Sequence, residues 1–234
     1  MKAIIFDFDD TLADFSSARD KIVEFLDSYC KGRYGIENFG EVFDAIDTEM
    51  TIKARTKKDP KIDNRALWAK IASKRLGVNL TNSQCQKIRK LYWKLALEKT
   101  RLLPHAKEVL KQLSKRYDLY VLSDADGEPA KEKIDRIKKL SIYRYFKGSS
   151  FGDAIGTTKP DMKFYTYLIK RYEINPKECI MVGDKPQYDL EPAKKLGMKT
   201  VWMKYGRWAD VQKQRFKYVD FAIKNLRGLL KITK

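Results

Sequence analysis

Three aspartates directly follow a short apolar segment near the start of the chain. The segment is Ala3–Phe6, and Asp7, Asp9 and Asp10 come after it. Near-continuous apolar residues over this length are typical of a strand that is buried on both faces of a parallel sheet. Three packed carboxylates repel one another unless a cation lies between them. Because ligands bind at the carboxyl ends of strands in open α/β sheets, the cluster favours a catalytic site.

Two structural interpretations of these acids fit less well. Aspartate is favoured at helix N-termini, but capping the next helix needs one carboxylate rather than three. A calcium loop that starts at Asp7 needs glycine at its sixth position and glutamate at its twelfth. The chain has Leu12 and Ala18 at these positions. The spacing therefore favours catalytic chemistry.

Further polar residues end later apolar segments or precede a helix. They are Ser123 with Asp124, Lys159, and Gly183-Asp184 with Asp189 five residues after Asp184. In a parallel α/β sheet, all these positions meet at one edge. Carboxylates, a hydroxyl and a lysine suit phosphoryl transfer, with a carboxylate nucleophile, a magnesium ion on oxygen ligands and donors on the phosphate.

A parallel sheet is the element that brings these residues together. From Pro104 onwards, apolar segments typical of strands alternate with segments of helical periodicity, which indicates a parallel sheet. The expected strands are 119–122, 148–151, 179–182, 200–203 and 219–223, and the expected helices start at Pro104 or cover about 127–139, 161–173 and 187–196. The pattern predicts an α/β protein with a Rossmann-like core whose sheet is covered by helices on both faces.

Residues 15–99 carry no strand pattern, and we expect a separate all-helical unit inserted after the first strand. The first helix is expected to have its N-cap at Ser16 or Ser17 and to end at Gly32 or Gly35. The second and third are expected at 36–58 and 64–76. A capping box of Thr81 with Gln84 is expected to start the fourth.

The motifs together resemble motifs I to IV of the haloacid dehalogenase (HAD) superfamily. They occur in order as Asp7-Phe8-Asp9-Asp10-Thr11, Ser123, Lys159, and Gly183-Asp184 with Asp189. The resemblance covers essentially the whole chain. It implies an α/β catalytic core formed by 1–14 and 100–234, and a C1-type α-helical cap formed by 15–99. Within the superfamily, the chain resembles small-molecule phosphatases of the phosphoglycolate and archaeal glyceraldehyde-3-phosphate type.

The resemblance implies a magnesium-dependent phosphatase that acts on a small phosphorylated metabolite. Asp7 would attack phosphorus and become an aspartyl-phosphate, and Asp9 would act as general acid and then as general base. Magnesium would bind the Asp7 carboxylate, the Asp9 backbone carbonyl and the Asp184 carboxylate. Ser123 and Lys159 would bind the phosphoryl group, and Asp189 would orient Lys159 or a metal-bound water. Thr11 would fix the turn of motif I, and we count it with the substrate-binding residues.

The chain departs from the superfamily pattern after Ser123. The second motif usually continues with asparagine and glycine, whereas Asp124-Ala125-Asp126-Gly127 follows here. A backbone N–H can still serve there, so Asp124 remains an expected substrate-binding residue. The sequence assigns no role to Asp10, Asp14 or Asp126.

Two alternative functions stay open. A 2-haloacid dehalogenase shares the fold, although members of that group have tyrosine in place of Asp9. A nucleic-acid or partner-binding module would use the net charge of +18. We favour a lysine-rich solvated surface as the origin of this charge, because no nucleic-acid motif accompanies it, and we expect no nucleic-acid partner. Nothing in 15–99 distinguishes a sugar, a glycerate or a nucleotide as the leaving group.

The remaining candidates favour structural roles. Cys30, Cys85 and Cys179 are far apart and form no Cys-x-x-Cys pair, so we expect no zinc or disulfide framework and a reducing cytoplasm. No segment has the length of a membrane span, and we expect no membrane partner. His105 at a helix start and the aromatic residues Trp202, Tyr205, Trp208 and Phe216 are expected to pack rather than to bind a ligand.

Overall fold

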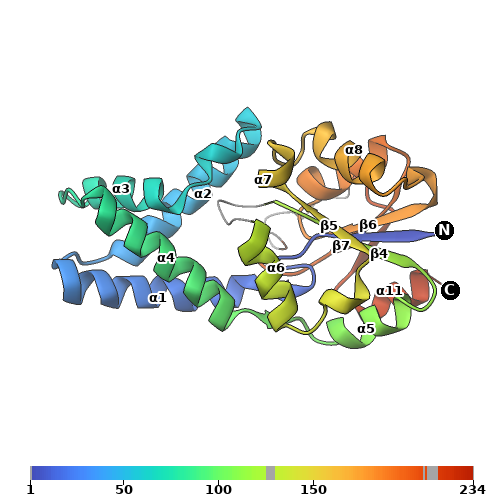
Figure 1. Cartoon of the computed structure of the whole chain (residues 1–234), viewed down its shortest axis with the longest axis horizontal. Helices are drawn as coiled ribbons and strands as arrows, with labels where there is room; N and C mark the ends of the chain where they lie inside the picture. Colours follow the sequence, from blue (N-terminus) through green and yellow to red (C-terminus); the bar gives the residue numbers. More distant parts are fainter. Residues whose placement is uncertain (1, 125–129, 208, 210–215, 234) are drawn as a thin grey trace.

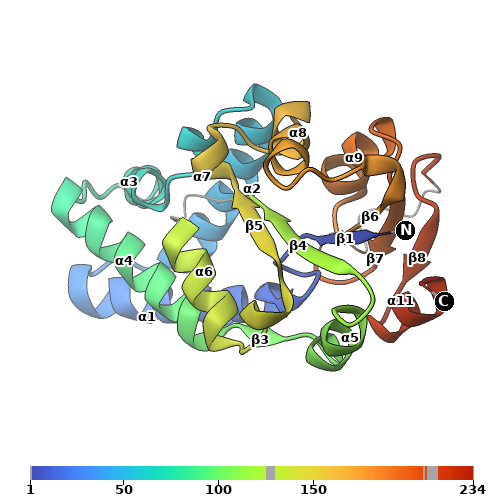
Figure 2. The same ribbon diagram turned by 45° about the vertical axis from the view of Figure 1, so that its right-hand side comes forward.

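The computed structural model describes residues 2–124, 130–207, 209 and 216–233. Within these residues, six parallel strands form one sheet in the order β5-β4-β1-β6-β7-β8 (Figure 2). The strands are β1 (Ala3–Phe6), β4 (Asp118–Ser123), β5 (Gly148–Phe151), β6 (Cys179–Gly183), β7 (Lys199–Met203) and β8 (Phe221–Ile223). The predicted Rossmann-like α/β sheet is therefore confirmed.

Helices cover both faces of the sheet (Figure 1). They are α5 (Ala106–Leu113), α6 (Ala130–Lys139) and α11 (Arg227–Ile232) on one face, and α8 (Met162–Arg171) and α9 (Glu191–Lys195) on the other, with the short α7 (Gly152–Ile155) after β5. In β1, Ile4 and Phe6 pack into the first core, whereas Ala3 and Ile5 pack into the second. Because side chains alternate along a strand, burial of both faces requires the continuous apolar segment.

Several boundaries differ slightly from the prediction. The last strand begins at Phe221 rather than at 219. The helix expected at 187–196 consists of a π-helical turn, Pro186–Leu190, followed by α9. Cys179 and Trp202 are buried in the core, as expected. Trp208 lies outside the described residues.

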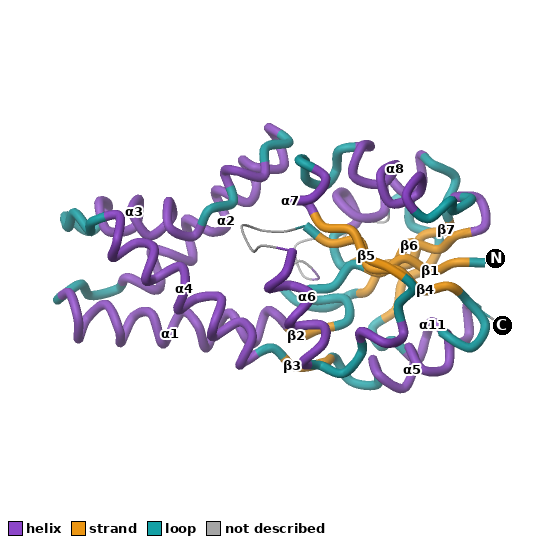
Figure 3. The backbone as a smooth tube through the Cα atoms, viewed as in Figure 1, coloured by secondary structure: helices purple, strands orange, loops and turns teal. Residues whose placement is uncertain are grey.

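Four helices form a second unit beyond the carboxyl ends of the strands (Figures 1 and 3). They are α1 (Phe15–Tyr34), α2 (Phe39–Lys57), α3 (Arg65–Arg75) and α4 (Asn82–Lys99), called the helical unit below. Its own apolar core includes Phe43, Trp68 and Tyr92. The expected capping box of Thr81 with Gln84 is present at the start of α4. No helix in the described part of the chain is long and apolar enough to cross a membrane.

The prediction that Ser16 or Ser17 caps α1 is wrong. Asp14 is the N-cap, because its Oδ1 accepts a hydrogen bond of 3.0 Å from the Ser17 amide. The Ser16 hydroxyl donates instead to Asp10 Oδ2 at 2.7 Å. At the other end, Gly35 has a φ of 66° and closes the helix, whereas Gly32 lies inside it.

Two short strands connect the helical unit to the sheet-bearing core. The strands β2 (Ala13–Asp14) and β3 (Arg101–Leu102) pair antiparallel, with Ala13 opposite Leu102 and Asp14 opposite Arg101. A two-residue strand has no recognisable periodicity, and the sequence therefore did not predict this pair. The pairing holds the incoming and outgoing chains side by side.

Candidate active site

The carboxyl ends of β1, β4 and β6 face the helical unit (Figure 1). The Asp7 amide donates to the Val182 carbonyl at 2.9 Å and so continues the pairing of β1 with β6 by one residue. This contact places Asp7 beside the loop that follows β6. Asp7, Ser123 and Lys159 are all buried at this edge.

Lys159 links two of the predicted acids. Its Nζ lies 2.7 Å from Asp7 Oδ1 and 2.8 Å from Asp189 Oδ1, and its side chain is 1% exposed. Burial alone lowers the pKa of Lys159. The adjacent carboxylates of Asp189 and Asp7 raise this pKa by more than burial lowers it, so the net shift is upward. Lys159 is therefore a permanent cation beside the Asp7 carboxylate.

Three buried carboxylates form an acidic cluster. Ligand oxygens of Asp7, Asp184 and Asp189 lie within 4.8 Å of one another. Burial raises the pKa of Asp184 well above its usual value, and the Lys185 ammonium, 3.2 Å from the Asp184 carboxylate, offsets only part of this effect. Such a cluster is costly without cations, as the sequence indicated.

The acidic cluster fits a divalent cation with a preference for oxygen ligands. Asp184 Oδ2 is buried, and Lys185 Nζ lies 3.2 Å from it, but it accepts no hydrogen bond from the described residues. Carboxylate oxygens are the ligands that Mg²⁺ binds, together with water. Asp7 and Asp184 belong to the predicted metal set, and Asp189 joins them here. Asp9 is expected to bind the metal through its backbone carbonyl, and its carboxylate contacts other residues.

Two basic side chains hold the Asp9 carboxylate. Lys133 Nζ lies 3.2 Å from Asp9 Oδ2, and the Arg136 guanidinium donates to both oxygens of Asp9. Lys133 also lies 3.4 Å from Ser123 Oγ and donates to the Asp124 carbonyl. One lysine therefore connects the ends of β1 and β4.

Sequence reasoning missed Lys133 and Arg136. Both side chains are fully buried on α6, beside Ile137 on the face that packs against the sheet. The sequence did contain a signal for their burial, because both residues lie on the same helical face as the apolar residues Ala130 and Ile137. A basic residue on an apolar helical face needs an acidic partner, which Asp9 supplies.

Asp124 holds the segment that carries Lys159. Its Oδ1 accepts hydrogen bonds from Thr158 Oγ1 at 2.7 Å and from the Lys159 amide at 2.9 Å. Its Oδ2 lies 3.3 Å from Nη2 of Arg55, which belongs to α2 of the helical unit. The Asp124 side chain thus joins β4, the Lys159 segment and the helical unit.

Gly183 allows Asp189 to reach the cluster. A Cβ on Gly183 would lie 2.5 Å from Cβ and Oδ2 of Asp189, closer than side chains tolerate. Asp189 Oδ2 also accepts a hydrogen bond of 2.8 Å from the Lys185 amide. The loop after β6 therefore depends on glycine at its start to position both acids.

The other acids of the first motif have structural partners. Asp10, whose φ is 58°, accepts hydrogen bonds from the Phe15 amide and from the amide and hydroxyl of Ser16. Burial raises the pKa of Asp10. Asp14 caps α1, and Asp126 lies outside the described residues. The buried hydroxyl of Thr11 makes no hydrogen bond to the described part of the chain.

His105 and Trp202 occupy structural positions, as expected. His105 Nδ1 lies 3.4 Å from Glu108 at the start of α5. Trp202 packs against Phe216, and its Nε1 donates to the Asp184 carbonyl at 3.0 Å. Trp202 therefore supports the loop after β6 from within the core.

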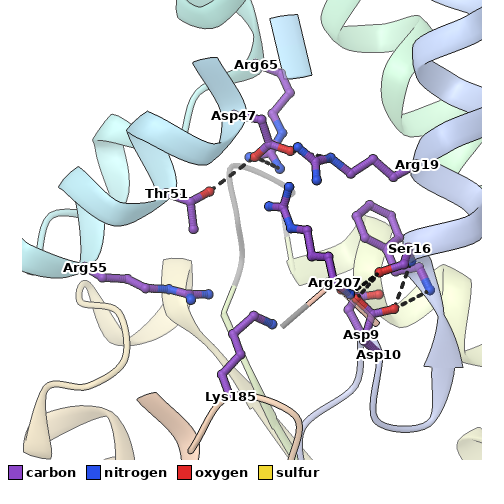
Figure 4. A pocket seen from close by; sticks show the side chains of 11 residues that line it. Asp9, Asp10, Ser16, Arg19, Asp47, Thr51, Arg55, Arg65, Lys185 and Arg207 are labelled. Carbon is purple, nitrogen blue, oxygen red and sulfur yellow. Dashed lines mark hydrogen bonds and ion pairs between the residues drawn. The ribbon is translucent and has the colours of Figure 1, made fainter. Parts of the chain in front are cut away.

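A cavity lies between the helical unit and the sheet edge (Figure 4). The centre of a water-sized sphere can reach about 50 Å³ of it, within about 460 Å³ of space that includes its opening to solvent. Its lining comes from both parts of the chain: Asp9, Asp10, Phe15, Ser16, Arg19, Asp47, Thr51, Arg55, Arg65, Lys185 and Arg207. A small organic molecule that enters this cavity meets the carboxylate of Asp9 at the end of β1.

Comparisons with known proteins agree with this geometry. A family model of haloacid dehalogenase-like hydrolases matches residues 1–197. The chain is 35% identical over 133 residues to the glyceraldehyde 3-phosphate phosphatase of Pyrococcus furiosus, which covers 56% of this chain and 54% of that protein. The chain thus spans about half the length of the curated archaeal relatives it matches.

Solved structures share the whole fold. The HAD-hydrolase YfnB from Bacillus subtilis, bound to magnesium, superimposes with a TM-score of 0.79 at 17% identity and covers 99% of this chain and 97% of its own. A HAD phosphatase from Thermococcus onnurineus has a TM-score of 0.71 at 22% identity, with 100% and 98% covered. At these identities the likeness shows the fold alone.

Proposed function

Because the chain belongs to the haloacid dehalogenase-like hydrolases, we propose that it is a magnesium-dependent phosphatase of a small phosphorylated metabolite. The observation that carries the proposal is the buried contact of 2.7 Å between the Asp7 carboxylate and Lys159, within a cluster of three acids. A nucleophilic carboxylate needs cations around it to accept an anionic phosphate ester. The named relatives support a phosphorylated substrate, since P. furiosus glyceraldehyde 3-phosphate phosphatase is one of them.

In the proposed reaction, Asp7 attacks phosphorus and the bond from phosphorus to the ester oxygen breaks. Asp9 gives its proton to the departing alkoxide. Asp9 then removes a proton from the water that attacks the aspartyl-phosphate, which releases phosphate and restores Asp7. The contacts of Asp9 with Lys133 and Arg136 hold its carboxylate in place at the end of β1.

The remaining site residues bind and position. Ser123 and Lys159 donate to the phosphoryl oxygens, and Asp189 orients Lys159 through the contact of 2.8 Å. Asp124 keeps the Lys159 segment in place through Thr158 and the Lys159 amide. We therefore assign Asp124 a positioning role in addition to any backbone contact with substrate.

Magnesium would bind Asp7 and Asp184 near Asp189, with the Asp9 carbonyl as the further ligand that the sequence resemblance implies. Bound there, the ion supplies positive charge that offsets the charge of the phosphoryl group. The helical unit would act as the cap of this site, so that the core comprises 1–14 and 100–234 and the cap 15–99. The cavity lies between these two parts.

Phosphate release from a panel of phosphorylated metabolites and p-nitrophenyl phosphate tests the proposal, with magnesium and with EDTA. We expect turnover that needs magnesium, because the ion neutralises a cluster of buried carboxylates. Chloride release from 2-chloropropionate is measured alongside. Chloride release in EDTA without phosphate release from any panel member would show a dehalogenase instead.

Magnesium should also stabilise the protein in a pH-dependent manner. The raised pKa of Asp184 means that the folded protein retains a proton that the unfolded chain loses near pH 3.8. In EDTA, this contribution to stability is complete below pH 3.8 and is lost as the pH rises through the raised value. Because magnesium binds the ionised carboxylate, its stabilising effect grows over the same window.

Thermal unfolding at pH 5 and pH 7.5 measures this effect. At pH 7.5 and a magnesium concentration of about 100 times Kd, we expect a gain of about 2.7 kcal/mol. This corresponds to roughly 5–10 °C in Tm for a chain of this size. The gain should be smaller at pH 5 and largely absent in Asp184→Asn, while the exposed control Asp20→Asn keeps it. An undiminished magnesium effect in Asp184→Asn would contradict the assigned site.

A further inference from the structure

We propose that the substrate carries a second anionic group on its leaving group, bound in the cavity by Arg55, Lys185 and Arg207. This inference rests on the proposed phosphatase function and specifies its substrate class. In the proposed reaction Asp9 protonates the ester oxygen, so this oxygen must lie near Asp9, which lines the cavity. The rest of the substrate then extends into the space between the helical unit and the sheet edge.

The lining of this cavity is predominantly basic. Five of its side chains are cationic and three are acidic. The cationic residues are Arg19, Arg55, Arg65, Lys185 and Arg207, and the acidic residues are Asp9, Asp10 and Asp47. An anionic leaving group can accept charge-assisted hydrogen bonds from several of these cations, whereas a neutral one such as an unmodified sugar gains less from them.

The three acids already have partners inside the protein. Asp9 is held by Lys133 and Arg136, neither of which lines the cavity. Asp10 accepts three hydrogen bonds from Phe15 and Ser16. The donors to Asp9 lie behind the cavity wall, and those to Asp10 belong to the lining itself, so both carboxylates are already engaged within the protein.

Asp47 balances the two arginines at the far wall. Its carboxylate lies 2.8 Å from Nε of Arg19 and 3.7 Å from Nη2 of Arg65. The Arg65 guanidinium also packs 3.8 Å from the centre of the Trp68 ring. These contacts fix Arg19 and Arg65 as part of the helical unit's own structure.

Three further cations approach the cavity from three separate segments (Figure 4), and two of them also pair with buried acids, Arg55 with Asp124 and Lys185 with Asp184. Arg55 comes from α2, Lys185 follows β6, and Arg207 follows β7. The Arg55 guanidinium is oriented by Asp124, at 3.3 Å, and by the Tyr188 ring, 4.5 Å from its centre. Arg207 Nη1 lies 3.2 Å from the Thr48 hydroxyl. Preoriented guanidinium groups are suited to bind a carboxylate or a phosphate through paired hydrogen bonds.

Pairs of substrates that differ in one anionic group test the inference. The carboxylate pair is phosphoglycolate and 2-hydroxyethyl phosphate, and the phosphate pair is propane-1,3-diol bisphosphate and 3-hydroxypropyl phosphate. We expect kcat/KM of the wild-type protein to be at least about 10-fold higher for the charged member of one pair, the size of one charge-assisted hydrogen bond. The pair with the larger ratio identifies the anion.

Variants assign the preference to the cavity. Arg207→Gln and Arg55→Gln should each lower the ratio of charged to neutral substrate about 10-fold, and Arg207→Lys should lower it less. Lys53→Gln removes the same charge from an exposed position on α2 and should leave the ratio at the wild-type value. Measuring both Arg207 and Arg55 guards against the loss of folding in one variant.

The outcomes separate this inference from the function on which it rests. If p-nitrophenyl phosphate is hydrolysed but neutral members are turned over as well as charged ones, or no charged member is turned over, this inference alone is wrong. A preference that persists in both arginine variants would also overturn it. If no phosphate ester is hydrolysed, including p-nitrophenyl phosphate, the phosphatase function is wrong and this inference with it.

Discussion

Asp7→Asn should lower kcat for phosphate release by at least about a thousandfold, because an amide cannot serve as the nucleophile. The substitution keeps the shape of the side chain, and the amide oxygen can still accept a hydrogen bond from Lys159, now 2.7 Å from Asp7 Oδ1. It also removes one charge from a cluster of three carboxylates. We therefore expect Tm in EDTA to be equal to or higher than that of the wild-type protein.

The intermediate gives a second readout for the same variant. Acid quenching during turnover of a substrate labelled in its phosphate should leave label on the wild-type protein and none on Asp7→Asn. Asp20→Asn, an exposed site on α1, provides the matched control and should retain both activity and labelling. Activity of Asp7→Asn within about tenfold of the wild-type value would exclude Asp7 as the nucleophile.

Lys159→Met should have the largest combined effect on activity and stability. Removing the ammonium leaves Asp7 and Asp189 buried beside Asp184 without the cation that now lies 2.7 and 2.8 Å from the first two. Breaking a buried ion pair from one side costs about 3–5 kcal/mol. For a chain of this size, this corresponds to a fall in Tm of roughly 6–20 °C. Loss of the donor to the phosphoryl group should lower kcat/KM at least about 100-fold.

The pH dependence of this destabilisation identifies its cause. Protonation of the carboxyl groups removes their repulsion, so the difference in Tm between wild type and Lys159→Met should shrink from pH 7.5 to pH 4. Added magnesium should restore part of the stability without restoring activity. Lys163→Met makes the same substitution at an exposed position of α8 and should change neither quantity appreciably. A constant difference across this pH range would indicate lost packing rather than exposed charge.

The sequence predicted the residues at the sheet edge because strand ends carry recognisable signals. Asp7, Ser123 and Asp184 each follow an apolar segment, and parallel strands must end at the same edge. The structure confirms the sheet and places these side chains among buried polar groups. Their catalytic roles remain proposals that the substitutions above test.

Contacts between distant segments could not be predicted in the same way. Asp124 contacts Thr158 and Arg55, which lie 34 and 69 residues away in the sequence. Lys133 and Arg136 lie on a helix rich in basic residues, where only the position of Asp9 distinguishes buried cations from solvated ones. Local periodicity contains no information on such partners, because the approach of the sheet edge decides them.

The N-cap of α1 shows a different limit. Asp14, Ser16 and Ser17 are all good capping residues within four positions. Asp14 is chosen because Ser16 is already bonded to Asp10, whose left-handed backbone turns the chain after β1. The choice between neighbouring caps therefore depended on a turn that the sequence pattern did not reveal.

The paired strands β2 and β3 make the helical unit exchangeable. Because Asp14 lies opposite Arg101 in an antiparallel pair, a tight turn of two residues could join them in place of all four helices. The ends of β1 and β4 would keep their positions, since neither strand depends on the length of what is inserted. The proposed cap could therefore be exchanged for another segment without moving the proposed catalytic residues at the ends of β1 and β4.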